Sequence, residues 1–131
     1  TDGSLWVMGN NARGQLGLGD GSATTVLTPT QALASGAALV SVGTDHLMVV
    51  KTDGSLWGSG ANANYAQLCL GEVYPTATDR TQLTRILADG VRAVSAAFEH
   101  SLILKTDGSV WACGRDDNAE RGFQPPVLAR A

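Results

Sequence analysis

The hexapeptide Thr-Asp-Gly-Ser-Leu-Trp recurs along this chain and limits its fold more than any other feature. It occupies residues 1–6 and 52–57, and a third copy with valine at the fifth position occupies residues 106–111. The copies begin at positions 1, 52 and 106, so they are 51 and 54 positions apart. A period of this length is typical of solenoids and propellers, in which each repeat is one supersecondary unit. The sequence therefore predicts a repeat protein.

The Asp-Gly pair at the centre of each copy predicts a β-hairpin. Flanked by alternating apolar residues, this pair is the strongest short signal for a two-residue type I′ turn. In the second copy we expect strands at 46–51 and 55–60, and in the third at 100–105 and 109–114. These strands are too apolar for an isolated ribbon, so each hairpin is expected to lie inside a larger sheet.

Further short strands flank the hairpins. Residues 39–43 predict a strand buried on both faces, and residues 83–87 predict a weak fourth strand. Pro29 opens a segment that we expect at a sheet edge, because proline cannot donate to a ladder. Residues 90–96 align without a gap with residues 36–42, and 126–129 are expected to form the last strand.

These strands group into units. The prediction is an all-β chain without a long helix, made of an outer half unit at 1–35 and two four-stranded antiparallel units at 36–89 and 90–131. Because residue 1 falls at a hairpin turn, we expect the chain to be a piece of a longer protein.

Two more motifs accompany the hexapeptide: Val-Ser-Val-Gly before His46, and Gly-Asn-Asn-Ala-Arg-Gly-Gln-Leu-Gly at residues 9–17. Together the motifs resemble the repeat of the regulator of chromosome condensation family. The resemblance covers nearly the whole chain, although Cys69 replaces the glycine matched by Gly17 and the third copy lacks Gly-Gln-Leu-Gly. Members of that family are β-propellers, commonly of seven four-stranded blades. The resemblance therefore implies a partial propeller of two full blades and half a blade.

Composition excludes some classes of function. The net charge is −3 and the pI is about 5.1, so no basic stripe supports binding of nucleic acid. No apolar run approaches the ~18 residues of a membrane span. The cysteine count leaves the compartment open, while richness in Thr, Ser, Asn and Gly with two lysines favours a bacterial extracellular or cell-surface protein.

The two cysteines lie in different repeats. Cys69 is in a predicted loop, and Cys113 takes the strand position held by Met8 and Ser59 in the other copies. Their spacing matches neither a disulfide framework nor a metal site. We therefore expect packed free thiols rather than a disulfide, and their redox activity stays open.

Trp6, Trp57 and Trp111 occupy equivalent positions, which favours packing between blades over a ligand platform. His46 and His100 each follow an acidic residue and open the second strand of a blade. Because neither has a second histidine at ligand spacing, we expect them to satisfy backbone groups rather than to bind metal or to catalyse.

The sequence contains no convergent nucleophile, base and oxyanion set, and no cofactor or metal motif. The leading hypothesis is therefore a non-enzymatic protein–protein interaction scaffold. Proteins of the resembled family bind small GTPases as exchange factors, dock on chromatin or cover the active sites of enzymes, and the acidic charge argues against chromatin. The alternative is part of an extracellular carbohydrate-binding or enzyme-associated propeller.

The longest connection, at residues 61–82, is the candidate partner-binding segment. It carries Tyr65, Tyr74 and Arg80, residue types that dominate interface energetics. The alternative is a solvated loop with Tyr74 packed on the blade edge. Two and a half blades also leave apolar faces uncovered, so we expect self-association or association with the rest of the propeller.

Overall fold

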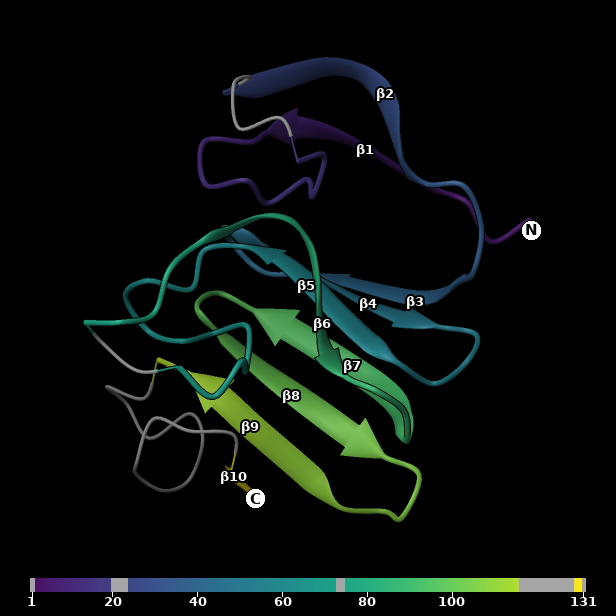
Figure 1. Ribbon diagram of the computed structural model, residues 1–131, viewed down its shortest axis with the longest axis vertical. Helices are drawn as coiled ribbons and strands as arrows, with labels where there is room; N and C mark the ends of the chain where they lie inside the picture. Colours follow the sequence, from purple (N-terminus) through teal and green to yellow (C-terminus); the bar gives the residue numbers. More distant parts are fainter. Residues whose placement is uncertain (1, 20–23, 73–74, 116–128, 131) are drawn as a thin grey trace.

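The computed structural model describes residues 2–19, 24–72, 75–115 and 129–130 of the chain. These residues form three antiparallel sheets in chain order, which we call the first, second and third blades (Figure 1). The first blade pairs β1 (Leu5–Asn10) with β2 (Thr25–Leu33). The second has the order β3 (Ala37–Val42), β4 (His46–Lys51), β5 (Leu56–Gly60) and β6 (Arg80–Leu87). The third has the order β7 (Val91–Ala97), β8 (His100–Lys105), β9 (Val110–Gly114) and β10 (Ala129–Arg130).

This architecture confirms the predicted all-β fold of two four-stranded blades preceded by the outer half of another. The two complete hairpins lie at the predicted positions, while β6 begins at Arg80, three residues before the predicted start. Pro29 lies in β2, which pairs only with β1 among the described strands, at an irregularity in the register. Most of the predicted last strand lies outside the described residues, where only Ala129 and Arg130 belong to β10.

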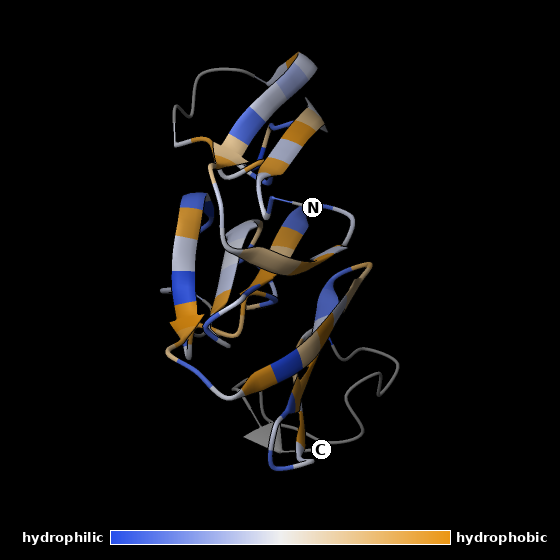
Figure 2. Cartoon of the chain, turned by 90° about the vertical axis from the view of Figure 1, so that its right-hand side faces the viewer, coloured by the Kyte–Doolittle hydropathy of each residue, from blue (hydrophilic) through white to orange (hydrophobic). Residues whose placement is uncertain are grey.

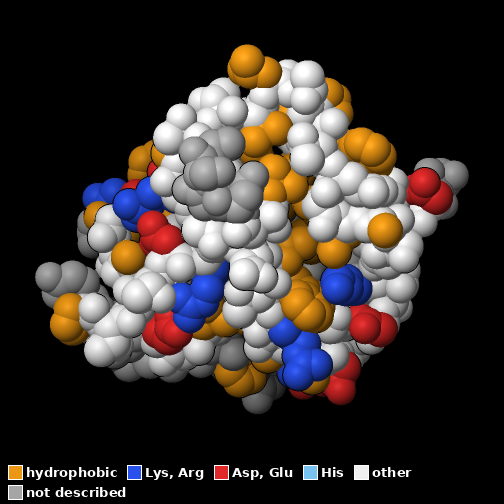
Figure 3. Space-filling model, turned by 45° about the horizontal axis from the view of Figure 1, so that its top comes forward, with side chains coloured by type: hydrophobic (Ala, Val, Ile, Leu, Met, Phe, Trp, Pro, Cys, Tyr) orange, Lys and Arg blue, Asp and Glu red, His pale blue; other side chains and the backbone are white. Residues whose placement is uncertain are grey.

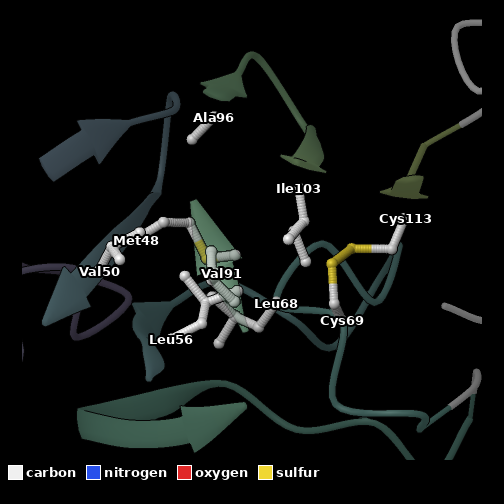
Figure 4. Packing of buried hydrophobic residues seen from close by; sticks show 9 residues of the cluster. All are labelled: Met48, Val50, Leu56, Leu68, Cys69, Val91, Ala96, Ile103 and Cys113. Carbon is white, nitrogen blue, oxygen red and sulfur yellow. A yellow bond between two sulfur atoms is a disulfide. The ribbon is translucent and has the colours of Figure 1, made fainter. Parts of the chain in front are cut away.

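The blades are stacked face to face from the N-terminus to the C-terminus (Figure 1), and β7 contacts both β3 and β4. Two hydrophobic clusters fill the junctions. The buried residues of the first junction are Leu5, Val7, Leu16, Leu47 and Val49. Those of the second, shown in Figure 4, are Met48, Val50, Leu56, Leu68, Cys69, Val91, Ala96, Ile103 and Cys113. The strands are banded with hydrophobic and polar residues (Figure 2), because successive side chains of a strand point to opposite faces.

Backbone hydrogen bonds also tie the first two hairpin turns to the blades that follow them. The Ala37 N–H donates to the Gly3 carbonyl over 2.9 Å, and the Val91 N–H donates to the Gly54 carbonyl over 3.1 Å. The start of each complete blade is further joined to its own turn, as in the bond from the Thr52 N–H to the Gly36 carbonyl. The connection between a turn and the following blade therefore does not depend on side chains, because it is made by backbone hydrogen bonds.

The prediction that the first strand of the second blade is buried on both faces is wrong. Leu39 and Val40 of β3 are 45% exposed and Val42 is 64% exposed. The reason is that β3 is an edge strand whose Val40 and Val42 line a hollow of about 320 Å³ facing the two-stranded first blade. Hydrophobic side chains gather along the middle of the face shown in Figure 3. Self-association through such apolar surface stays a prediction.

The turns also differ from the predicted type I′ geometry. The Gly54 N–H donates to the Lys51 carbonyl and the Lys51 N–H donates to the Ser55 carbonyl, both over 2.9 Å, so the loop has three residues. Its left-handed residue is Gly54, with φ of 80°, and Asp53 keeps a negative φ. This is a type I turn followed by a glycine bulge. Asp53 favours it because its carboxylate accepts a hydrogen bond from the Ser55 N–H over 2.9 Å.

Candidate protein-interaction surface

Each hexapeptide forms the same relay of side-chain hydrogen bonds. In the second copy the Ser55 hydroxyl donates to Asp53 Oδ1 over 2.6 Å and accepts from Trp57 Nε1–H over 2.9 Å. The other copies repeat the relay with Asp2, Ser4 and Trp6, and with Asp107, Ser109 and Trp111. Hydrogen bonds from the Ser55 hydroxyl and N–H lower the pKa of Asp53. The motif therefore holds the hairpin in shape.

The three indole rings differ in their surroundings. Trp57 and Trp111 are half-buried, and Lys51 Nζ lies 3.9 Å from the centroid of the Trp57 ring. Lys105 Nζ lies 5.9 Å from the Trp111 ring, a longer version of the same contact. Trp6 is 56% exposed, so the prediction of a packed ring is wrong for that copy. Its side chain lines the open hollow that Val40 and Val42 also line, where no neighbour among the described residues encloses it.

His46 joins the second blade to the third. Its side chain is fully buried, and Nε2 lies 2.9 Å from the Ser101 hydroxyl of β8. That hydroxyl donates its proton to the Gln67 carbonyl over 2.9 Å, so the imidazole must be the donor to Ser101. The ring therefore binds a side chain rather than the backbone group expected from the sequence.

Burial, together with a smaller contribution from the nearby charge of His100, lowers the pKa of His46 to about 4. The ring is therefore neutral at physiological pH. Because Ser101 directs its proton away from His46 and both groups are buried, the pair is not an activated nucleophile. His100 is the half-buried counterpart at the start of β8.

The connection between β5 and β6 folds back on itself around Asn62, whose side chain is fully buried. Asn62 Oδ1 accepts from the Leu68 N–H over 3.0 Å, and Nδ2 donates to Glu72 Oε2 over 3.0 Å. Asp79 Oδ1 accepts from the backbone N–H groups of Asn62 and Ala63, each over 2.9 Å. One buried asparagine thus holds together positions that are up to 17 residues apart in sequence.

The predicted partner-binding residues have separate environments in this connection. The Arg115 guanidinium lies 5.3 Å from the centroid of the half-buried Tyr65 ring. Arg80 forms an ion pair with Glu72 and donates to the Thr78 carbonyl over 2.7 Å. Tyr74 lies outside the described residues. The structure thus gives Tyr65 and Arg80 different partners, and the prediction that they bind a partner protein stays a prediction.

Polar contacts connect this segment to the equivalent connection of the first blade. Arg13 Nε lies 3.0 Å from Asp79 Oδ2, and the Gly19 N–H donates to the Thr81 carbonyl over 2.9 Å. The Ser59 hydroxyl of β5 donates to the Gln15 carbonyl over 3.1 Å. The two connections are therefore held side by side on one rim. Figure 1 shows them on its left, opposite the hairpin turns on its right.

A disulfide joins Cys69 in this connection to Cys113 in β9, so the prediction of free thiols is wrong (Figure 4). The Cα atoms are 5.4 Å apart, within the usual range for this bond. Face-to-face stacking of the blades brings the turn after β5 onto β9, a proximity that cysteine spacing does not reveal.

The positions joined by the disulfide also meet at the other blade junction. At the preceding junction the equivalent positions are Gly17 and Ser59, and a Cβ added to Gly17 would lie 3.0 Å from the Ser59 hydroxyl. Both members of this contacting pair are cysteine at the next junction. The cysteines thus occupy a pair of positions that already meet at the other junction, and that contact is seen only in the structure.

Neither a metal centre nor a membrane helix emerges from the described ranges. They contain no group of three or more His, Cys, Asp and Glu side chains placed to hold a metal ion. They also contain no helix long and apolar enough to cross a membrane.

Two segments of the chain match known repeat families. Residues 2–50 and residues 91–120 match two sequence profiles, each described as the Regulator of chromosome condensation (RCC1) repeat. The chain is 31% identical over 123 residues to human E3 ubiquitin-protein ligase HERC2, covering 92% of this chain and 2% of that protein. It is 30% identical over 125 residues to the mouse X-linked retinitis pigmentosa GTPase regulator, covering 92% and 12%. For the mouse secretion-regulating guanine nucleotide exchange factor the identity is 27% over 124 residues, covering 90% and 27%.

Solved structures agree with these matches. Yeast RCC1 (Prp20), crystallised with Kap60, aligns with a TM-score of 0.76 at 20% identity, covering 97% of this chain and 32% of that one. Human WBSCR16 aligns with a TM-score of 0.75 at 25% identity, covering 98% and 33%. These alignments confirm the partial propeller fold. The chain spans about a third of these structures and at most 27% of the three sequence relatives described above.

Proposed function

Because this chain is built from repeats of the regulator of chromosome condensation family, we propose that it is a non-enzymatic scaffold that binds a partner protein. We place the binding surface on the rim formed by residues 11–19, 61–72 and 75–79, which we call the connection rim. Proteins bind partners through loops that a rigid framework positions, and the stacked blades provide such a framework.

The observation that carries this proposal is that an ion pair and a disulfide hold the connection rim in place. The ion pair between Arg13 and Asp79 joins the two connections. The Cys69–Cys113 disulfide fixes the second connection to the third blade. A surface that is rigid before binding loses less conformational entropy when it binds, so more of the contact energy appears as affinity.

The rim also presents groups suited to recognition. Asn64, Thr76 and Thr78 are exposed, and Tyr65 is half-exposed beneath the Arg115 guanidinium. Tyrosine and arginine are enriched among residues that contribute most to binding energy. The polar side chains around them resemble the rim of a protein interface more than a small-molecule cavity.

We propose a small GTPase as the partner class. Two relatives support this choice through their names, a GTPase regulator and a guanine nucleotide exchange factor. Each is matched over a minor part of its length, so the partner class is to be tested directly on this chain.

Site-specific photocrosslinking tests the surface and the partner together. A photoreactive phenylalanine analogue replaces Asn64 on the connection rim, and the matched control replaces Thr106 in an exposed hairpin turn. Each variant is irradiated with purified small GTPases in nucleotide-free and nucleotide-bound forms. We expect adducts from position 64 and not from position 106. Adducts from position 106 alone, or no adduct together with binding to a glycan array, would contradict the proposal.

A further inference from the structure

We propose that the Cys69–Cys113 disulfide is a redox latch: a dithiol reductant opens it, and the connection at residues 61–72 then loses its covalent attachment to the third blade and becomes less ordered. The latch would control the order of the connection rim. Its effect on partner binding rests on the proposed function, whereas its effect on the connection itself does not.

The two blade junctions provide an internal comparison. At the first junction the Ser59 hydroxyl donates to the Gln15 carbonyl over 3.1 Å, beside Gly17. At the second, the Cys113 sulfur lies 3.4 Å from the carbonyl oxygen of Gln67, the residue equivalent to Gln15. The disulfide sulfur of Cys113 carries no proton, so it only packs against the Gln67 carbonyl, and the two junctions join equivalent positions by a hydrogen bond in one case and by a disulfide in the other. Loss of the bond leaves an arrangement that this fold already contains.

The latched turn adopts an unfavourable backbone conformation. Ala66 and Cys69 have φ of 56° and 58°. In the first connection the equivalent positions are glycines, Gly14 and Gly17, which adopt this left-handed region without steric cost. A residue with a Cβ is disfavoured there. The disulfide holds the turn in this conformation, so its reduction allows the turn to relax.

The third blade does not depend on the disulfide in the same way. Cys113 lies in β9 between β8 and β10, and its register with Ser101 is part of a continuous ladder. Ser101 independently donates to the Gln67 carbonyl. Reduction is therefore expected to loosen the connection while β8 and β9 stay paired.

Reduction proceeds by thiol–disulfide exchange. A thiolate of the dithiol attacks Cys69 Sγ, the S–S bond breaks, and its electron pair goes to Cys113 Sγ, which takes up a proton. The second thiol of the reductant then displaces Cys69, which leaves as a thiolate and takes up a proton. The protein gains two electrons and two protons, and the dithiol becomes a cyclic disulfide.

The turn side of the bond is the point of attack. Cys69 is 4% exposed and Cys113 is 1% exposed, so both sulfurs need a local opening before a thiol reaches them. Cys69 is followed by the half-buried Leu70 and the exposed Gly71, so the turn reaches the surface within two residues. Cys113 is enclosed within a strand.

Hydrogen exchange of the free chain tests the latch without any partner. After treatment with dithiothreitol, we expect backbone amides of residues 61–72 to exchange at least about ten-fold faster, as in local unfolding. Amides of residues 11–19 serve as the control in the same molecule, because the first junction has no disulfide. Equal exchange in oxidised and reduced chains would overturn the proposal, as would a native chain that dithiothreitol does not reduce.

Two variants separate the latch from a general loss of structure. Cys69→Gly combined with Cys113→Ser copies the first junction at the two cysteine positions and removes the Cβ from the left-handed residue 69, so its residues 61–72 are expected to stay protected and insensitive to dithiothreitol. Cys113→Ser alone leaves a non-glycine residue in the left-handed turn, and it is expected to exchange like the reduced chain. Identical exchange in both variants would contradict the proposed role of the turn conformation.

Partner binding is a separate measurement. If the proposed function holds, the reduced chain should give fewer adducts from position 64 with a small GTPase than the oxidised chain. A failure to bind any GTPase would remove the proposed function but would leave the exchange result intact. Faster exchange of residues 61–72 with unchanged GTPase binding would instead show that the latch does not regulate the rim.

Discussion

His46 and Ser101 meet across the junction of the second and third blades, with Nε2 of the imidazole 2.9 Å from the hydroxyl oxygen. The contact joins residues 55 positions apart and lies entirely inside the protein. The other ring nitrogen, Nδ1, is buried and has no hydrogen-bond partner among the described residues, so protonation there would create a charge that nothing in this part of the structure accepts.

Stability should therefore fall as the pH falls from 6.5 towards 4. In this window the unfolded chain, with an ordinary histidine pKa of 6.5, binds a proton that His46 with a pKa of about 4 does not. Above pH 6.5 neither state binds it, and the stability is fully retained. The loss attributable to His46 at pH 4 is about 3 kcal/mol. Urea unfolding across this range measures it, with His46→Gln as the control in which this part of the dependence disappears. An equal pH dependence in His46→Gln would contradict the assignment.

The hydrogen-bond relay of the hexapeptide should matter more in the second blade than in the first. Ser55→Ala removes the acceptor of the Trp57 indole and the hydroxyl donor to Asp53 at a buried position, so we expect a loss of about 1–2 kcal/mol. Ser4→Ala removes the same bonds where Trp6 is exposed, and water replaces them, so we expect about 0.5 kcal/mol. Chemical denaturation compares the two variants. Equal losses would mean that the relay does not depend on burial.

Gly60 and Gly9 occupy equivalent positions with similar backbone angles but different surroundings. A Cβ at Gly60 would lie 2.3 Å from the Asp45 carbonyl oxygen, whereas a Cβ at Gly9 would meet nothing within 4 Å. Gly60→Ala is therefore expected to cost about 3 kcal/mol or more, and Gly9→Ala about 1–2 kcal/mol from backbone strain alone. Thermal unfolding of the two variants shows which one loses more stability. A larger effect at Gly9 would refute the steric account.

Asp79 should contribute more than its ion-pair partner. Arg13→Ala removes a half-exposed ion pair, worth less than about 1 kcal/mol, and the effect should shrink in high salt. Asp79→Ala also leaves the Asn62 and Ala63 N–H groups without their acceptor, so we expect about 2–3 kcal/mol with little salt dependence. Unfolding in low and high salt distinguishes the two. Matching losses would mean that the ion pair alone holds the connection.

Local features of the fold could be predicted from the sequence because they depend on nearby residues. The hairpins at β4–β5 and β8–β9 follow from the hexapeptide and its apolar flanks, and their order follows from the repeat period. The turn type differs from the prediction because the Ser55 side chain and N–H bind Asp53 and favour a three-residue loop. The prediction of a two-residue turn from an Asp-Gly pair does not take into account these hydrogen bonds between Ser55 and Asp53.

Relationships between blades were harder to predict. Ser101 takes the place of Leu47 in the repeat, so nothing in the second copy indicates a hydroxyl opposite His46. The Cys69–Cys113 bond depends on which turn faces which strand, and the exposure of Val42 depends on which strands face β3. The connection at residues 61–79 could be identified as a candidate site from its length, but its organisation around the buried Asn62 required the structure.

The backbone hydrogen bonds from the Ala37 N–H to Gly3 and from the Val91 N–H to Gly54 limit which insertions and deletions the encoded protein tolerates. An inserted or deleted stretch leaves these bonds intact only if each turn still meets the leading strand of a neighbouring unit. Duplications of complete units, here 51 or 54 residues long, satisfy that condition wherever their endpoints fall within the unit. Duplications of other lengths separate a turn carbonyl from the strand N–H that donates to it. Length variation among descendants of this sequence is therefore expected in whole units, with smaller changes confined to the connections.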